Sequence, residues 1–222
     1  MTYEQDRAAR ITTMLSTIQV ADPVIFVGNS HVEGFEKAFL QGEMRMAGKY
    51  VYFAGIAGAH YGTLHAYIPW AAIAAVHPSR IVIVEAINGA TVPSHFDSNG
   101  NATLAFGHSI LSTVATAKSI APVTLVVDPP PEQAQGIDPY RAHQAARWVY
   151  YAATENWANL GWTGSWPGTS GFVDLRSTMA ASPCSPPSVP YQYPCYAVPG
   201  STMDTVHWAK AGLQNMFERI VA

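Results

Sequence analysis

Residues 23–30, PVIFVGNS, decide the fold: this short apolar run ends in a glycine and two polar residues. Such a run is typical of a strand buried on both faces, which is the environment inside a parallel sheet. The stretch that follows, HVEGFEKAFLQG (31–42), places its apolar residues at helical intervals. A buried strand followed directly by a helix predicts the first unit of an α/β sheet, with Ser30 in the turn between them.

The same alternation continues to the end of the chain. Further apolar runs typical of strands lie at 49–55, 80–88, 122–130 and 171–175, and stretches with helical spacing lie at 62–76, 102–120, 140–160 and 207–222. The first twenty residues also predict a helix, because Thr2 and Gln5 have the spacing of a capping box. Five strands that alternate with helices predict an α/β fold, a three-layer α/β/α sandwich around a five-stranded, mostly parallel sheet.

The composition favours one globular domain. The chain has 222 residues, 49% hydrophobic and 12% charged, which suits one well-packed core, so we expect a single domain over 1–222. Two Gly-, Trp- or Pro-rich segments, at about 161–171 and 177–203, predict long ordered loops. The net charge of −3, with scattered Lys and Arg, argues against a nucleic-acid partner.

No segment predicts insertion into a membrane. The longest apolar stretch, Tyr67–Val76, is interrupted by a proline and is far shorter than the ~20 residues that a transmembrane helix requires. Glu4 and Asp6 stand where a secretory signal would carry positive charge. We therefore expect a soluble protein with no signal peptide in this chain.

The two cysteines, Cys184 and Cys195, lie in the second predicted loop and are a candidate disulfide. A bond between them would staple a Pro-rich segment and would indicate an extracellular protein. Reduced thiols would instead fit the cytoplasm, and the sequence leaves both readings open because it does not give the distance between the two side chains.

Turns with polar residues or glycine follow the first three predicted strands. Ser30 ends the first run, Gly58 follows the second and Asn88 follows the third. Because ligands bind beyond the carboxyl ends of the strands in such sheets, we expect these three positions to lie near one another. Close to the C-terminus, Asp204 precedes His207 by three positions, a spacing that lets one short turn aim a carboxylate at an imidazole.

Taken in order, these segments resemble the four sequence blocks of the SGNH hydrolases, also known as GDSL-type esterases and lipases. The blocks are GNS (28–30), GIAG (55–58), EAING (85–89) and DTVH (204–207). Each block alone is weak, but four in order, each at the expected end of its element, are specific, and they span essentially the whole chain. The resemblance implies a flavodoxin-like α/β/α fold and a serine esterase that needs no cofactor.

The resemblance also assigns roles to the residues of the four blocks. Ser30 would attack an ester carbonyl, His207 would act as general base and then as general acid, and Asp204 would orient the imidazole. The oxyanion would be held by the backbone N–H groups of Ser30 and Gly58 and by the side-chain amide of Asn88.

Two blocks depart from the usual pattern of the family. Asn29 stands where aspartate is usual beside the nucleophile, which removes a charge but none of the reacting groups. In the third block, Ala86 replaces a glycine and Gly89 replaces an aspartate. These changes put the shape of the oxyanion pocket, and with it the substrate subgroup, in question.

Other residues have both a functional and a structural interpretation. His31, beside the nucleophile, could contact the substrate or could serve packing at the rim. The aromatic residues of the late loops could stack on a sugar or could pack the loops onto the body of the protein; they are Trp162, Trp166, Tyr191, Tyr193 and Tyr196. No metal site is predicted, because the spacing of His60 and His65 matches no zinc pattern. Asp128, which precedes three consecutive prolines, is interpreted as a turn-former.

Three functions are compatible with these features. The first is hydrolysis of small acyl esters, such as acetyl esters, on a small molecule or a carbohydrate, through the Ser-His-Asp triad and an acyl-enzyme. The second is an O-acyltransferase that passes the acyl group to an alcohol in place of water. The third is a catalytically silent glycan-binding module with the same fold.

Overall fold

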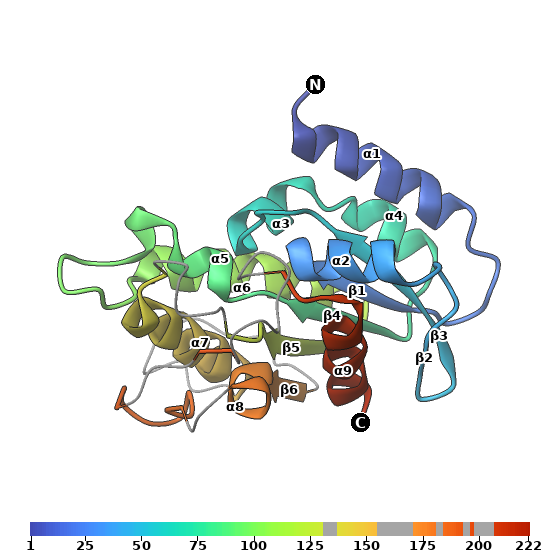
Figure 1. Ribbon diagram of the computed structural model, residues 1–222. Helices are drawn as coiled ribbons and strands as arrows, with labels where there is room; N and C mark the ends of the chain where they lie inside the picture. The colour runs from blue at the N-terminus through green and yellow to red at the C-terminus, as the bar shows by residue number, and fades with distance from the viewer. Residues whose placement is uncertain (131–136, 155–170, 181–183, 193–195, 198–206) are drawn as a thin grey trace.

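The computed structural model describes residues 1–130, 137–154, 171–180, 184–192, 196–197 and 207–222. It is an α/β fold around one sheet, with strands in the order β2-β3-β1-β4-β5-β6 (Figure 1). The strands are β1 (Val24–Gly28), β2 (Arg45–Met46), β3 (Lys49–Gly55), β4 (Arg80–Val84), β5 (Val123–Val127) and β6 (Gly171–Asp174). The helices are α1 (Tyr3–Ser16), α2 (Ser30–Ala38), α3 (Tyr61–Tyr67), α4 (Trp70–Ala75), α5 (Ile87–Ala90), η1 (Pro93–His95), α6 (Leu104–Lys118), α7 (Pro139–Ala153), α8 (Leu175–Met179) and α9 (Lys210–Val221).

The sheet has six strands, and the prediction of five was wrong by one edge strand. The additional strand, β2, is only two residues long and pairs antiparallel with β3. A tight turn joins them at Ala47 and Gly48, whose φ angles are +49° and +77°. Turns with positive φ at both central positions match the twist of a hairpin. A strand of two residues has no periodicity, so the apolar pattern could not reveal it.

The winding of the five parallel strands reverses next to β1. β1 pairs with β3 on one side and with β4 on the other, and the sheet then continues through β5 to β6. In chain order this is the doubly wound, flavodoxin-like arrangement 2-1-3-4-5 of the parallel strands. Ligands bind where the winding reverses, beyond the carboxyl ends of β1 and β4. Those ends lead into Ser30 and Asn88.

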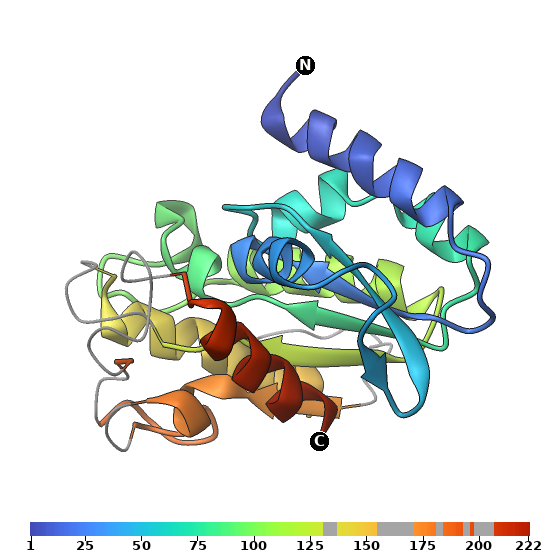
Figure 2. The same cartoon turned by 45° about the vertical axis from the view of Figure 1, so that its right-hand side comes forward.

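Helices cover both faces of the sheet because alternate strand residues point to opposite sides. Ile25 and Val27 of β1 join a core with α1, α3, α4, α6 and α7. Val24 and Phe26 join the second core, which packs against α2, α8 and α9. On this second face, α2 and α9 lie side by side in front of the sheet in both views (Figures 1 and 2).

Most predicted helices are present, with two differences in extent. The capping box of α1 is formed by Thr2 and Gln5 as predicted, although the helix ends at Ser16. The helical pattern at 62–76 is divided into α3 and α4 at Pro69. Proline lacks an N–H and disfavours helical backbone at the preceding residue, which accounts for the break.

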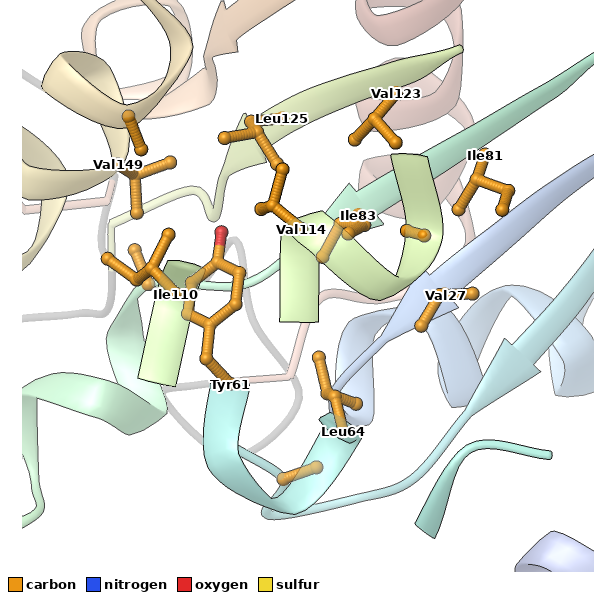
Figure 3. Close-up of a cluster of buried hydrophobic side chains, with 14 of the residues drawn as sticks. Val27, Tyr61, Leu64, Ile81, Ile83, Ile110, Val114, Val123, Leu125 and Val149 are labelled. Carbon is orange, nitrogen blue, oxygen red and sulfur yellow. The ribbon is translucent and has the colours of Figure 1, made fainter. Parts of the chain in front are cut away.

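The larger core contains one buried hydroxyl among apolar side chains. Figure 3 shows Tyr61 of α3 directed toward Ile110, Leu125 and Val149. Tyr61 is fully buried, and within the described part of the chain its hydroxyl has no hydrogen-bond partner. Burial, followed by the negative charges that Glu85 and Asp128 carry when they are ionised, raises the pKa of Tyr61 well above its ordinary value. The hydroxyl therefore stays protonated beside the acidic residues described below.

The predicted loops fall partly outside the described residues. The segment expected to begin at 177 starts inside α8, and residue 171, the last of the other predicted loop, opens β6. None of the helices described is long and apolar enough to cross a membrane.

Candidate active site

The nucleophile candidate lies in a tight turn between β1 and α2. Ser30 is the first residue of α2, and Asn29 caps this helix by accepting a hydrogen bond from the backbone N–H of His31 at 3.0 Å. The turn lies close to the end of β3, since a Cβ on Gly55 would stand 2.1 Å from the backbone nitrogen of Glu33. Only glycine fits this approach of strand and helix. The half-buried Ser30 is thus held at the end of the sheet.

Ser30 and His207 line the same cavity, although most of the chain separates them in sequence. His207 lies just before α9, and α9 packs beside α2. The cavity has a volume of about 500 Å³. Its described lining consists of Ser30, His31, Glu33, Gly34, Lys37, Ala38, Ala57, His207, Trp208, Lys210 and Leu213. The structure therefore brings the predicted nucleophile and the predicted base to one surface.

The second and third predicted turns contact each other, although neither Gly58 nor Asn88 belongs to the described lining of the cavity. Gly58 is exposed and has a φ of +74°, a backbone conformation that disfavours other residues. Asn88 is half-buried and donates from Nδ2 to the carbonyl of Ala59 at 3.0 Å, which ties the two turns together. Within the described part of the chain, the backbone N–H groups of Ser30 and Gly58 have no hydrogen-bond acceptor. Backbone N–H groups without an acceptor can donate hydrogen bonds to an anion.

Asp128 is a central residue of this region, and its interpretation as a mere turn-former was wrong. It follows β5, is 1% exposed, and accepts hydrogen bonds from two other strand ends. The donors from the β4 end are the backbone N–H groups of Ala86 at 2.7 Å and Ile87 at 3.0 Å. From the β1 end, Asn29 Nδ2 and His31 Nδ1 lie 3.1 Å from its oxygens. One carboxylate therefore connects the ends of β1, β4 and β5.

Hydrogen bonds keep Asp128 ionised despite its burial. Burial opposes the charge, but the hydrogen bond and charge of His31, together with the N–H groups of Ile87 and Ala86, hold the pKa of Asp128 below its ordinary value. A buried anion is tolerated when donors surround it.

Glu85 is a second buried carboxyl, and its surroundings favour the protonated form instead. Burial and then the charge of Asp128 raise the pKa of Glu85 well above its ordinary value. Its Oε1 accepts the N–H of Gly89 at 2.8 Å, while Oε2 has no donor among the described residues. A protonated Oε2 can itself donate to Asp128, which makes the two carboxyls compatible. Gly89 fits this turn because a Cβ there would lie 2.6 Å from the ring of Phe106.

Glu33 organises the other side of the nucleophile turn. Its Oε2 accepts the backbone N–H of Ala57 at 3.0 Å, next to Gly58, and also the hydroxyl of Tyr3 in a very short contact. Lys37 lies 2.7 Å from its other oxygen. Burial opposes its charge, but hydrogen bonds from Lys37, Tyr3 and Ala57, and then the charge of Arg7, hold the pKa of Glu33 below its ordinary value.

Arg7 links α1 to this side of the site. Its Nε and Nη2 donate to the carbonyl of Gly55 at 3.1 and 2.8 Å, and Nη2 also pairs closely with Glu36. The N-terminal helix is therefore attached directly to the end of β3, where the second turn of the site begins.

The remaining predicted site residues have different positions. His31 is 1% exposed, lines the cavity and holds Asp128, so the structure gives it a packing role as well as access to the cavity. Tyr191 packs its ring against Tyr140 and His143 and is absent from the described cavity lining. Asp204, Trp162, Trp166 and Tyr193 lie outside the described residues. Their roles stay predictions.

Cys184 is buried and disulfide-bonded. Cys195 lies outside the described residues, so the pairing of the two cysteines stays a prediction.

The histidines near α3 form a ring contact. His60 caps α3 by accepting the N–H of Gly62 at 3.2 Å, and its ring lies 5.2 Å from that of His95. Burial first, and then the charge of His95, lowers the pKa of His60. In the described ranges no group of three His, Cys, Asp or Glu side chains has the arrangement of a metal site.

Sequence reasoning missed three acidic residues that organise the site: Asp128, Glu85 and Glu33. A signal for two of them was present, because Asp128 and Glu85 each follow an apolar strand directly. An acidic residue at the buried end of a parallel strand needs several donors, and the neighbouring strand ends are the nearest source. Glu33 had no such signal, since it reads as an ordinary polar position of a helix.

Comparison with known proteins supports the fold. No protein-family model and no curated protein matches the chain significantly. Among solved structures, a protein from Streptococcus pneumonia, provisionally described as a platelet activating factor, is similar with a TM-score of 0.58 and 14% identity, over 98% of this chain and 91% of its own. A protein from Lactobacillus plantarum has a TM-score of 0.48 and 12% identity, over 91% and 96% of the two chains. At these identities, the first similarity concerns the fold alone.

Proposed function

We propose that this chain is a serine ester hydrolase of the SGNH type. Ser30 serves as nucleophile, His207 as general base, and Asp204 as the residue that orients the imidazole. The observation that carries the proposal is the position of Ser30 and His207 on one cavity, at the reversal of strand order where α/β sheets bind ligands. The four sequence blocks and the fold shared with the streptococcal protein point the same way.

The proposed reaction has two steps. His207 takes the proton of the Ser30 hydroxyl as its oxygen attacks the ester carbonyl, and the same proton then goes to the departing alcohol. The acyl group stays on Ser30 as an ester. In the second step, His207 takes a proton from water, the resulting hydroxide attacks the acyl-enzyme, and the carboxylic acid leaves as Ser30 regains its proton.

Three hydrogen-bond donors are available for the oxyanion of each tetrahedral intermediate. Two are the N–H groups of Ser30 and Gly58, and Ser30 also lies at the N-terminus of α2, where the helix dipole favours negative charge. The third is the second hydrogen on Nδ2 of Asn88, whose first hydrogen is engaged by Ala59. Removing one such donor typically costs about 10²–10³ in kcat.

The size of the cavity bears on the substrate. Its volume of about 500 Å³ lies within the range of about 300–1,000 Å³ that is usual for small-molecule sites. A small acyl group such as acetyl would leave much of this space for the alcohol part of the ester. Most of the surface that lines the cavity is apolar, although the lining residues include the exposed Lys37 and Lys210.

Hydrolysis of a chromogenic acetyl ester by purified protein tests the proposal. We expect Ser30→Ala to lower kcat by about 10⁴-fold or more and to abolish labelling by a fluorophosphonate, because the nucleophile is lost. Ser119→Ala is the matched control, since Ser119 is an exposed serine at the end of α6 that bonds only within its own helix. Esterase activity that survives Ser30→Ala unchanged would refute the mechanism.

The two alternatives have distinct outcomes in the same assay. An O-acyltransferase would transfer the acyl group to an added alcohol or sugar in strong preference to water, which product analysis detects. A glycan-binding module would bind oligosaccharides without turnover and without labelling of Ser30.

A further inference from the structure

Four donors from two turns of the candidate site converge on one acceptor in the polar cluster beside the nucleophile. The carboxylate of Asp128 receives hydrogen bonds from Asn29 and His31 on one side and from the N–H groups of Ala86 and Ile87 on the other. Every donor belongs to a turn that carries a proposed catalytic group, because Ser30 lies between the first two and Asn88 follows the last two directly.

Only a carboxylate fits this arrangement fully. Both oxygens of an ionised aspartate accept, whereas an asparagine side chain offers one acceptor and one donor group. Asp128 Oδ2 receives both backbone N–H groups and one contact from Asn29, and Oδ1 receives His31 together with the second contact from Asn29. An amide at position 128 would therefore direct its NH₂ group at least partly toward other donors.

The amide of Asn29 is equally specific. Its Oδ1 accepts the N–H of His31 and its Nδ2 donates to Asp128, so both ends of the side chain are used. An aspartate at position 29 would place a second carboxylate about 3.1 Å from the first in a buried space. Two carboxylates at that separation do not both ionise.

We propose that Asp128 is a positioning residue for the reaction, which holds the Ser30 turn against the Asn88 turn, and that position 29 is an amide because the buried charge resides at position 128. The inference rests on the proposed function for its activity readout. It also gives a physical reason why this chain has GNS where GDS is usual. Positions 29 and 128 share a single negative charge, and in this chain the charge is at position 128.

Three variants test this sharing of one charge: Asn29→Asp, Asp128→Asn and the double variant that carries both. In the double variant the pair is reversed, since the amide at 128 can accept Ala86 and Ile87 through its oxygen and donate through nitrogen to the carboxylate at 29. Asp97→Asn is the matched control. Asp97 also accepts two backbone N–H groups, those of Asn99 and Asn101, but it lies in an exposed loop and does not line the cavity.

We expect the variants to differ in kcat and much less in KM. A displacement of about 1 Å in a positioned group can cost about 100-fold in rate, so Asn29→Asp should lose about 100-fold in kcat and Asp128→Asn about 10-fold. The double variant should be at least about tenfold more active than Asn29→Asp, while Asp97→Asn stays within about twofold of wild type. Wild-type kcat in Asn29→Asp, or a double variant no more active than Asn29→Asp, would overturn the inference.

Hydrogen exchange of the backbone provides a readout that does not depend on catalysis. In Asp128→Asn, the amides of Ala86 and Ile87 should exchange faster than in wild type, while those of Asn99 and Asn101 do not change. Unchanged protection at Ala86 and Ile87 would overturn the inference even if Asn29→Asp fails to fold. If the proposed function itself is wrong, the result is different: esterase activity does not depend on Ser30.

Discussion

Two carboxylates lie on opposite sides of the nucleophile turn, and their charges are balanced in different ways. Asp128, on the β4 and β5 side, is 1% exposed and is surrounded by backbone N–H groups, an amide and an imidazole. Glu33, on the β3 side, pairs with Lys37 and approaches Arg7 to 3.8 Å, and it also bonds to Tyr3. Each carboxylate nevertheless fixes a backbone turn of the candidate site.

The difference separates two means of holding a reactive turn in place. Hydrogen-bond donors in a buried space are screened very little by salt. Ion pairs that reach the surface are screened, and the long side chains that form them lose conformational entropy. The turns held by Asp128 should therefore be rigid, and their stability should not depend on salt. For the turn held by Glu33, the contribution of each partner to stability should depend on how deeply that partner is buried.

The largest expected effect is the loss of the buried partner on the Glu33 side. Arg7→Met removes a guanidinium that satisfies the carbonyl of Gly55 and balances Glu33 and Glu36. Breaking a buried pair from one side typically costs about 3–5 kcal/mol, because the other charge stays buried without compensation. Denaturant unfolding of Arg7→Met should show a loss of that order.

The same substitution on the exposed face of α1 provides the control. Arg10 pairs with Asp6 at 2.8 Å, but its side chain is 69% exposed, so Arg10→Met should change the unfolding free energy by less than about 0.5 kcal/mol. Equal losses in the two variants would mean that the site side of α1 is no more important for stability than its solvent side.

The contrast also shows what the sequence could and could not specify about the fold. The apolar runs of β1, β3, β4 and β5 are continuous and end in glycine or acidic residues, so their strands and the parallel sheet were predictable. The hairpin strand β2 was not, because a strand of two residues has no periodicity. The division of 62–76 into two helices was indicated by Pro69, but the helical spacing alone does not show it.

For the candidate site, the sequence predicted which residues lie at the strand ends but not the hydrogen bonds that join them. Ser30, Gly58 and Asn88 could be placed at strand ends, and the structure brings them to one edge of the sheet. The hydrogen bonds of Asp128 reach residues about forty and about a hundred positions earlier in the chain. No local pattern encodes such contacts, since they arise only when β1, β4 and β5 align in register.

The cavity on the Glu33 side should control substrate size. Gly34 lies one turn after Ser30, and a Cβ there would be 3.4 Å from Leu213, so a larger side chain must project into the cavity. Gly34→Leu should lower kcat/KM by about tenfold for a bulky ester relative to a small one, since such discrimination is typical of apolar pockets. Gly34→Ala, which adds only a methyl group, is the matched control. A panel of esters of increasing size measures the ratio, and equal losses for all esters would exclude Gly34 as a size determinant.

On the Asp128 side, Glu85 should make stability depend on pH. The pKa of Glu85 is raised in the folded protein by burial and by Asp128, whereas a glutamate in an unfolded chain has a pKa of about 4.3. Above that pH the unfolded chain releases a proton that the folded chain retains, so this carboxyl lowers the free energy of unfolding as pH rises. Glu85→Gln keeps an acceptor for Gly89 and a donor for Asp128 without the titration. The free energy of unfolding of the variant, compared with that of wild type, should therefore be larger at pH 8 than at pH 5.

Thermal unfolding at several pH values measures this gain, at about 2–4 °C for each kcal/mol in a chain of this size. Glu43→Gln is the control, because Glu43 is an exposed glutamate before β2 that bonds to a single backbone N–H, that of Leu40. A stability difference between Glu85→Gln and wild type that does not change from pH 5 to pH 8 would show that Glu85 is ionised in the folded protein.

The smallest effect is expected at the exposed partner of Glu33. Lys37 lies 2.7 Å from Glu33, but its side chain is 74% exposed, so Lys37→Gln should cost at most about 0.5 kcal/mol. That cost should vanish near 1 M salt, where the screening length is only about 3 Å. The effect of Asp128→Asn should persist at the same salt concentration, because its partners are buried. If both variants respond to salt alike, the two carboxylates are balanced in the same way, and the distinction between buried dipoles and surface ion pairs does not hold for this site.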